Sequence, residues 1–568
     1  LPILNSPVIP IAVQAASREL KRQGPKGRRA TPQGLSEVRE LLGTASRQSD
    51  LLIEHLHKIQ DRFGHLSADH LAALAEEMKL PQTSVYEVAT FYHHFDVVKE
   101  GQEAPASLTV RVCDGLSCEM AGAQDLLQRL PEILGRKVRV IPAPCVGRCE
   151  QAPAAVVGQH PIAQATADKV TQAVQAGQIR HEPAPYTDMG AYQKAGGYQL
   201  LQACVSGQRD VEDVLKTMES SGLRGLGGAG FPAGRKWRIV RAEAGPRLMA
   251  VNIDEGEPGT FKDRHYLERD PHRFLEGMLI AAWAVGIERI YVYLRDEYHG
   301  CRAMLEEEIA QLQAHPPIAN LPAIELRRGA GAYICGEESA MIESIEGKRG
   351  MPRLRPPYVA QVGLFGRPTL EHNFETLFWV REILEKGGAW FASHGRNGRQ
   401  GLRSFSVSGR VKNPGVKLAP AGITIQQLID EHCGGMQDGH RFYAYLPGGA
   451  SGGILPATMN DIPLDFDTLQ PYGCFIGSAA VIVLSDQDTA TAAARNMMKF
   501  FQHESCGQCT PCRVGTAKAA ALMEKPQWDL ALLADLSSVM RDASICGLGQ
   551  AAPNPMDCVI KYFPHELA

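Results

Sequence analysis

Several features that would assign this sequence to a specialised class of protein are absent. The net charge at pH 7 is only −4, which excludes the broad basic surface of a nucleic-acid-binding protein. The longest apolar stretches, residues 277–287 and 473–484, fall well short of the ~20 residues that a membrane-spanning helix needs. The apolar segment 7–13 follows no charged residues, so it makes a poor signal peptide. We therefore expect a cytoplasmic protein with no membrane span and no nucleic-acid partner.

The chain also lacks internal repeats and low-complexity tracts. At 568 residues it is too long for one hydrophobic core, and three or four domains are expected. Changes in hydrophobic period predict a multidomain protein of the α/β and α+β classes. The expected segments are an arm (1–33, with basic residues Arg18, Lys21, Arg22, Lys26, Arg28 and Arg29), a helical bundle (34–100), a small α/β unit (101–180), a Pro- and Gly-rich linker (181–207), a unit of helices and short strands (208–400), a β-rich α+β module (401–485) and a helical C-terminal region (486–568).

Residues 222–237 read GLRGLGGAGFPAGRKW and contain a G-x-G-x-x-G pattern. A Rossmann fingerprint requires a strand before the glycines and a helix that starts within them. Here a helical pattern precedes them, and Pro232 and Gly234 argue against a helix directly afterwards. Only Asp254, at the end of a predicted strand, favours the Rossmann alternative. The preferred interpretation is a glycine-rich loop whose N–H groups approach a phosphate, with Lys236 as a point charge.

Two further loops combine glycines with acids. NIDEGEPG (252–259) places three carboxylates in a turn after a predicted strand, and GAGAYICGEE (329–338) repeats the scheme. Between glycines and apolar strands, these acids are better explained as acceptors for ribityl or ribose hydroxyls than as a solvated surface. Phe231 and Tyr358 could stack on a flat ring.

The 14 cysteines are grouped rather than scattered, which favours metal ligation over disulfides. Cys506, Cys509 and Cys512 form a compact tripod that suits a cubane, with Cys546 as the fourth ligand, whereas structural zinc usually takes two separated C-x-x-C pairs. A second group comprises the pairs Cys113/Cys118 and Cys145/Cys149. Two separated pairs suit a two-iron cluster, and the group has no C-x-x-C redox motif.

The loop motifs and ESCGQCTPCRVGT (504–516) together resemble the flavin-bearing, NADH-oxidising subunit of respiratory complex I and related diaphorase subunits. The resemblance covers roughly residues 200–565, and residues 34–180 resemble the thioredoxin-like [2Fe–2S] subunit of the same complex. It implies a Rossmann-like domain that binds FMN and NADH, a ubiquitin-like β-grasp domain and a helical [4Fe–4S] domain. It names the eight grouped cysteines as cluster ligands.

The same resemblance carries the family's cofactor contacts onto this sequence. The implied flavin contacts are Gly225, Gly227, Lys236, Asn252, Asp254, Glu255, Gly336 and Asn373, and the implied nucleotide contacts are Phe231, Glu257, Glu338 and Tyr358, with Glu337 as a further cofactor-binding acid. No residue is required as a general acid or base. Leu226 stands where the family often has Arg, and His372 where it usually has Asn.

The order of the fused segments, with both cysteine groups intact, looks most like the β subunit of a molybdenum- or tungsten-dependent formate dehydrogenase. In that case a catalytic α subunit oxidises formate and this chain reduces NAD. The alternatives are the diaphorase subunit of an NAD-reducing hydrogenase and a complex I fusion. A different class would be a zinc-stabilised scaffold subunit without flavin.

Overall fold

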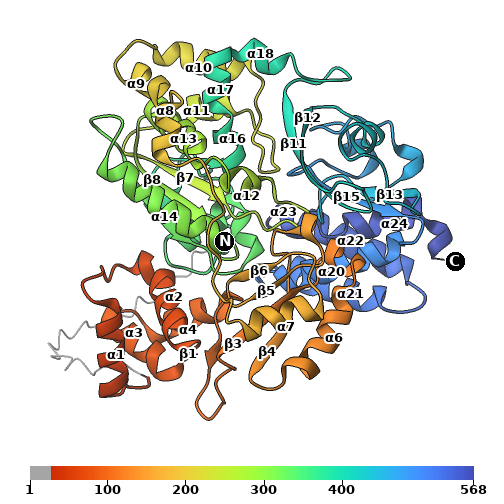
Figure 1. Cartoon of the computed structure of the whole chain (residues 1–568), viewed down its shortest axis with the longest axis horizontal. Helices are drawn as coiled ribbons and strands as arrows, with labels where there is room; N and C mark the ends of the chain where they lie inside the picture. Colours follow the sequence, from red (N-terminus) through yellow and green to blue (C-terminus); the bar gives the residue numbers. More distant parts are fainter. Residues whose placement is uncertain (1–26, 568) are drawn as a thin grey trace, which may run out of the picture.

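A computed structural model describes residues 27–567, and Figure 1 shows their arrangement. Most of the expected arm, including Arg18, Lys21, Arg22 and Lys26, lies outside the described residues. Arg28 lies within them and pairs with Glu100 (Nη1–Oε2 2.9 Å). Among residues 27–567, no helix is both long and apolar enough to cross a membrane.

The first part of the chain folds as a helical bundle, at the lower left of Figure 1. Its helices are α1 (Pro32–Leu42), α2 (Leu52–Phe63), α3 (Ala68–Met78) and α4 (Gln82–Phe91), and the two-residue strands β1 (Leu66–Ser67) and β2 (Val97–Val98) pair in parallel. Thr31 and Ser67 cap α1 and α3 by accepting backbone N–H bonds, as expected for hydroxyl side chains at a helix start.

A mixed four-stranded sheet follows, with strand order β4-β3-β5-β6. Its elements are β3 (Leu108–Cys113), α5 (Leu116–Met120), α6 (Ala123–Leu134), β4 (Val138–Ala143), β5 (Ala155–Val157), β6 (His160–Ile162) and α7 (Ala167–Gln175). The strand β3 pairs in parallel with β4 and antiparallel with β5. Cys113 is the last residue of β3, so the sheet delivers one predicted cluster ligand directly to a loop.

The expectation of a linker over residues 181–207 is wrong for its second half. This segment contains two helices, α8 (Met189–Lys194) and α9 (Gln199–Val205). Its apolar residues look isolated in the sequence, but Tyr192, Tyr198 and Leu201 pack into the core of the next domain. The Tyr192 hydroxyl donates to the buried Glu276 (2.6 Å), which fixes the segment to α13 (Pro271–Val285).

The central domain is built on a parallel four-stranded sheet with order β10-β7-β8-β9. Its strands are β7 (Arg247–Ile253), β8 (Ile287–Leu294), β9 (Ala323–Arg328) and β10 (Thr369–Asn373). Its helices are α10 (Val211–Ser220), α11 (Ala233–Ala242), α12 (Lys262–Leu267), α13, α14 (His299–Ala314), α15 (Glu338–Ile345), α16 (Phe374–Phe378), α17 (Val380–Lys386) and α18 (Gly388–Ala392). Because all four strands are parallel, their carboxyl ends share one edge of the sheet, where ligands bind in open α/β folds.

The glycine-rich stretch lies between α10 and α11, not after a strand. The absence of a preceding strand agrees with the preferred interpretation of this loop. The expectation that no helix follows directly is wrong, because α11 begins at Ala233. Pro232 occupies the N-cap position, where its missing N–H costs nothing, and Gly234 sits in the first turn against the backbone of α10.

The next module is a five-stranded sheet with order β12-β11-β15-β13-β14. Its elements are β11 (Leu402–Gly409), β12 (Gly415–Pro420), α19 (Ile425–Gln427), β13 (Phe442–Leu446), β14 (Leu455–Pro456) and β15 (Ala480–Ser485). A complete capping box at Thr424 and Gln427 starts the helical segment that packs on this sheet.

The C-terminal region is helical, at the blue end of Figure 1. It consists of α20 (Ala490–Glu504), α21 (Thr510–Met523), α22 (Leu530–Ala543), α23 (Gly547–Ala551) and α24 (Asn554–Tyr562). One continuous hydrophobic core joins these helices to the five-stranded module and the N-terminal bundle, through residues such as Leu56, Ile334, Val481 and Phe501. The bundle, the five-stranded module and the C-terminal helices therefore share one core, whereas the small α/β unit and most of the central domain have cores of their own.

Helix α13 crosses α16 at very close range, which generates a stability prediction. A Cβ at Gly277 would lie 2.0 Å from the Leu377 carbonyl oxygen. We expect Gly277→Ala to destabilise the central domain by about 1–3 kcal/mol through overpacking, despite the better helix propensity of alanine. Thermal unfolding of the purified protein measures this effect.

The matched control is Gly190→Ala in α8, where a Cβ would meet only Asp188 Oδ1 at an ordinary 3.5 Å. This variant should unfold at the same temperature as the parent or slightly above it. Equal behaviour of the two variants would contradict the close helix crossing.

Candidate functional site

The glycine-rich loop presents free backbone donors beside a helix N-terminus. Gly225 N–H donates to the Phe231 carbonyl (2.8 Å), and Leu226 N–H donates to the Thr376 hydroxyl (2.9 Å). Within residues 27–567, the N–H groups of residues 227–229 have no protein acceptor. They lie just ahead of α11, whose N-terminus adds a partial positive charge, so the loop can bind a phosphate.

Gly227 is required by a close approach between this loop and the sheet. A Cβ at Gly227 would lie 2.9 Å from the Cβ of Asn373, at the end of β10. The loop backbone therefore covers the carboxyl end of β10. A side chain at this position would push the free N–H groups away from that edge.

Lys236 brings its ammonium group to the same edge. Its Nζ lies 3.0 Å from the Glu371 carbonyl oxygen and 3.1 Å from a Glu371 carboxylate oxygen. The neighbouring His372 accepts a hydrogen bond from Trp237 Nε1 (2.8 Å), and burial together with the charge of Lys236 lowers its pKa well below the ordinary value. A neutral His372 thus orients the helix that carries Lys236. Glu371 was not among the predicted site residues.

Four of the predicted flavin contacts come together at the ends of β7 and β10: Asn252, Asp254, Gly336 and Asn373. The Asn252 side chain donates to the Gly336 carbonyl (2.9 Å) and accepts from the Asp254 N–H (3.0 Å). Asp254 Oδ2 is buried without a hydrogen-bond partner among the described residues, and burial raises the pKa of its carboxyl well above the ordinary value. A buried, unpartnered carboxyl oxygen fits a bound polar group that supplies the missing hydrogen bond.

Asn373 is held by a buried charge cluster that sequence reasoning missed. Its Nδ2 donates to Asp263 Oδ2 (2.6 Å). Lys262 Nζ lies 2.7 Å from Asp263 and 3.1 Å from Glu375, and the side chains of all three are at most 2 % exposed. The only signal in the sequence was their place at the end of the stretch NIDEGEPGTFKDR (252–264) and just after Asn373. Burying three charges together is tolerable only because they pair with one another.

Glu255 is occupied by protein donors rather than open to a ligand. Its carboxylate accepts from Asp263 N–H (2.8 Å), Arg264 N–H (3.1 Å) and the Tyr298 hydroxyl (2.8 Å). Burial and then the charge of Asp263 raise its pKa to about 7. Its side chain anchors α12 beneath the loop, so any contact with a cofactor falls to its backbone.

Glu257 connects the loop to two other parts of the chain. Its carboxylate accepts from the Tyr333 hydroxyl and from Ser451 N–H (2.8 Å), and burial raises its pKa. Ser451 belongs to the five-stranded module, which therefore closes over the carboxyl edge of the parallel sheet.

Glu337 and Glu338 share one arginine. Glu337 caps α15 by accepting from Ser339 N–H (3.0 Å) and Ala340 N–H (2.9 Å). Arg355 contacts Glu337 and lies 2.8 Å from Glu338. Burial and then the nearby Glu371 raise the pKa of Glu338, whereas Lys236 lowers it, so the acid loop and the lysine face one region.

The two predicted stacking rings remain at the surface. Tyr358 is 56 % exposed and Phe231 is 38 % exposed, with the Arg235 guanidinium 5.7 Å from the centre of the Phe231 ring. No hydrogen bond or ring contact among the described residues joins Tyr358 to the rest of the predicted site. Both rings are available to an added ligand.

The C-terminal cysteine group lines one small apolar cavity. Cys506, Cys509, Cys512 and Cys546 all contribute to its wall, together with Ile334, Pro352 and Leu548. Burial raises the pKa of the Cys512 thiol to about 11 and that of Cys546 to about 12. Thiolates would persist here only beside a compensating cation, which fits a metal cluster.

The N-terminal cysteine group is equally compact and more deeply buried. All four of its thiols are buried: Cys113, Cys118, Cys145 and Cys149. The Sγ atoms of the last two lie 3.3 Å apart. Gly115 lies against two of them, since a Cβ there would be 3.6 Å from Cys113 Sγ and from Cys145 Cβ. The four thiols suit a buried two-iron cluster.

Both cysteine groups are linked to the end of β7 and the loop after it through one intervening residue or segment. Arg295 donates to the carbonyl of Glu255 and to that of Cys145 (Nη2–O 2.7 Å), so one buried guanidinium joins this loop to the N-terminal group. On the other side, Ile334 lines the C-terminal cavity two residues before Gly336, which binds Asn252. The candidate flavin site is therefore linked to both cysteine groups.

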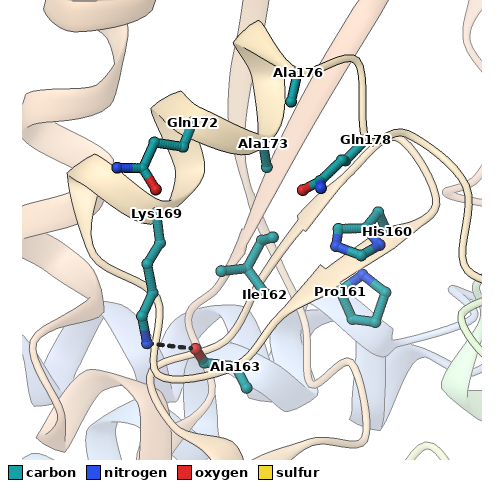
Figure 2. A pocket seen from close by; sticks show the side chains of 9 residues that line it. All are labelled: His160, Pro161, Ile162, Ala163, Lys169, Gln172, Ala173, Ala176 and Gln178. Carbon is teal, nitrogen blue, oxygen red and sulfur yellow. Dashed lines mark hydrogen bonds between the residues drawn. The ribbon is translucent and has the colours of Figure 1, made fainter.

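Another hollow lies apart from this site. Figure 2 shows it between β6 and α7, where Lys169 Nζ donates to the Ala163 carbonyl (3.2 Å). Its lining contains no cysteine and none of the predicted cofactor residues. We assign it no part in the site.

Family models match four consecutive parts of the chain. Residues 38–178 match a thioredoxin-like [2Fe-2S] ferredoxin, 218–382 the Nuo51 FMN-binding domain, 404–455 an SLBB domain, and 492–568 the NADH-ubiquinone oxidoreductase-F iron-sulfur binding region. The predicted fold classes and the predicted cofactors, FMN, NAD, [2Fe–2S] and [4Fe–4S], are thereby confirmed.

Relatives of known role cover the second part of this chain. An NADH-quinone oxidoreductase subunit of Rhizobium meliloti (strain 1021) is 40% identical over 392 residues, which is 66% of this chain and 93% of the relative. The mitochondrial NADH dehydrogenase [ubiquinone] flavoprotein 1 of Dictyostelium discoideum is 42% identical over 62% of this chain and 78% of its own length.

A solved structure extends the likeness to nearly the whole chain. It is described as an NAD+-reducing [NiFe]-hydrogenase in the H2-reduced state, with a TM-score of 0.79 and 34% identity over 92% of both chains. The chain belongs to the same family as these relatives, the flavoprotein subunits of NADH dehydrogenases, and is an NAD-dependent oxidoreductase subunit that combines an FMN-binding domain with [2Fe–2S] and [4Fe–4S] regions.

Proposed function

We propose that this chain is the diaphorase subunit of an NAD-dependent formate dehydrogenase. It would exchange hydride with NAD at the candidate flavin site and single electrons with a catalytic partner subunit through its clusters. The observation that carries the diaphorase role is the link from the end of β7 and its following loop to both cysteine groups, through Arg295 in one case and the Ile334–Gly336 segment in the other.

The residues that would hold FMN divide into donors and acceptors. The N–H groups of residues 227–229 and Lys236 suit its phosphate. Asn252, Asp254 and Asn373 suit its polar ring and ribityl atoms, since Asp254 Oδ2 has no hydrogen-bond partner among the described residues. When bound, FMN supplies the exchange between hydride and single electrons.

The nucleotide would bind beside the acid loop. Glu338 and Arg355 are partly exposed, and the exposed rings of Phe231 and Tyr358 can stack on the bases. Glu257, with its bonds to Tyr333 and Ser451, positions this wall rather than presenting a free carboxylate. No residue of the site needs to transfer a proton, because hydride transfer depends on the orientation of the reacting groups and on the exclusion of water.

The formate dehydrogenase assignment rests on the fused order of the [2Fe–2S], flavin and [4Fe–4S] segments with both cysteine groups intact. The second candidate is the diaphorase subunit of an NAD-reducing hydrogenase, favoured by the 34% identity over 92% of the solved chain. We also propose a cytoplasmic location, because none of the 14 cysteines, all of which lie within residues 27–567, forms a disulfide, as is usual in a reducing compartment.

Replacing Lys236 tests the phosphate assignment. Lys236→Met should weaken FMN binding by about tenfold or more, since a hydrogen bond to a charged group contributes ~1.5–3 kcal/mol. The flavin retained after desalting and titration of the stripped protein with FMN measure the loss. The control Lys216→Met lies on α10, where the lysine side chain is 66 % exposed, and should retain its flavin. Full retention by Lys236→Met would contradict the assignment.

Replacing Cys509 tests the order of electron transfer. We expect Cys509→Ser to keep NADH–ferricyanide activity largely intact but to uncouple NADH oxidation from the partner's reaction, because only the [4Fe–4S] site loses a ligand. Steady-state assays of both reactions in the intact complex distinguish the two effects. Cys204→Ala, outside both groups, should leave both reactions coupled. Loss of flavin reduction by NADH in folded Cys509→Ser would show that the proposed order is wrong.

The partner is tested by copurification from the native host. The complex should contain molybdenum or tungsten and should reduce NAD with formate. Nickel in the complex, with hydrogen-dependent and formate-independent NAD reduction, would support the hydrogenase assignment instead. A purified complex without flavin and with zinc in place of iron would contradict both.

A further inference from the structure

Two histidines and a glutamate from distant parts of the sequence meet outside the candidate flavin site. His93 lies just after α4 of the N-terminal bundle, and His503 and Glu504 end α20. We propose that they form a binding site for an exchangeable divalent transition-metal cation of the Zn²⁺ class. This site is separate from the eight cluster cysteines and goes beyond the proposed diaphorase function.

The ligand atoms already lie at coordinating separations. His503 Nδ1 is 3.1 Å from Glu504 Oε1, and His93 Nδ1 is 3.9 Å from the same oxygen. Ligand atoms from all three residues lie within 4.8 Å of one another, and the two imidazole rings are 4.1 Å apart between centroids. A tetrahedral Zn²⁺ with bonds of ~2.0–2.1 Å separates its ligand atoms by about 3.4 Å, so small side-chain rotations complete the site.

One ligand is fixed and two are accessible. The Glu504 side chain is 3 % exposed, and its second oxygen accepts from Tyr333 N–H (3.0 Å). The side chains of His93 and His503 are 39 % and 52 % exposed. A cation can therefore enter from water, keep water in its remaining coordination position and leave again.

The local charge favours a cation here. The charged groups that act on His93 and His503, apart from each other, are the carboxylates of Glu504, Glu297 and Asp114. A second cluster, His57, His94 and Asp296, has a similar ligand set but the opposite charge environment. There Arg328 donates to Asp296 (2.6 Å) and Arg302 lies 3.5 Å from it, so two guanidiniums already occupy the place of a cation.

Binding would fasten the bundle to the helix that leads into the [4Fe–4S] ligand loop. Glu504 stands two residues before Cys506, and Tyr333 precedes Ile334 in the wall of the cluster cavity. The cation would thus join the loop after α4 to α20 at a point where the chain enters the cluster. Its expected effect is to raise the thermal stability of the holoprotein without changing its iron content.

The test uses the untagged, oxidised holoprotein with Zn²⁺ in equilibrium dialysis and substoichiometric Cu²⁺ in EPR. We expect one cation per chain and nitrogen superhyperfine structure from two imidazoles. His93→Gln and His503→Gln should each weaken Zn²⁺ binding by about tenfold or more, since even second-shell changes cost 10–100-fold. The control His315→Gln removes an exposed histidine far from the site in the sequence and should bind as the parent does.

Iron and acid-labile sulfide are measured in every sample, so that cation bound by cluster thiols is recognised as loss of iron. Zn²⁺ affinity unchanged in both histidine variants, or binding that occurs only with loss of iron, would overturn the proposal. NADH–ferricyanide activity reports separately on the flavin site, so failure of the proposed function would leave these binding results interpretable.

Discussion

The architecture of the site depends on the loop that leaves β7 at the carboxyl edge of the parallel sheet. Its residues contact the acid loop, α12 and the five-stranded module. Asn252 binds Gly336, Glu255 anchors α12, and Glu257 reaches Ser451 of the five-stranded module. Because parallel strands bring their carboxyl ends to one edge, the end of β7 and the loop after it reach the acid loop directly and are linked to the cysteine groups through Arg295 and the 334–336 segment.

The buried charges beneath this loop fix the positions of side chains in the site and add little net stability. Exposed ion pairs are worth ~0–1 kcal/mol, whereas removing one partner of a buried pair costs ~3–5 kcal/mol, because a charge is left without compensation. Lys262, Asp263 and Glu375 form such a cluster, and Asp263 extends it to the amide of Asn373. The position of Asn373 is therefore set by groups that have little freedom to move.

Much of the fold and of the site chemistry could be predicted because it is local. The helical and alternating periods predicted the bundle, the small α/β unit and a central unit of helices and short strands, and the cysteine spacings indicated two clusters. Prediction failed where contacts with other parts of the chain decided the local structure. The segment 189–205 forms helices because Tyr192 and Leu201 find a neighbouring core, and Pro232 starts a helix rather than preventing one.

The sequence by itself determined which chemical groups are available. These are glycine-rich loops with free backbone N–H groups, acids that follow strands, and two sets of four thiols. Each depends only on residue type and short spacing. Tertiary structure alone decided how these groups are used. It turned the Glu255 carboxylate onto α12, paired Lys236 with Glu371, and joined Cys145 to Glu255 through Arg295. These contacts link residues far apart in the chain, and only the packing of several elements at one sheet edge brings them within hydrogen-bonding distance.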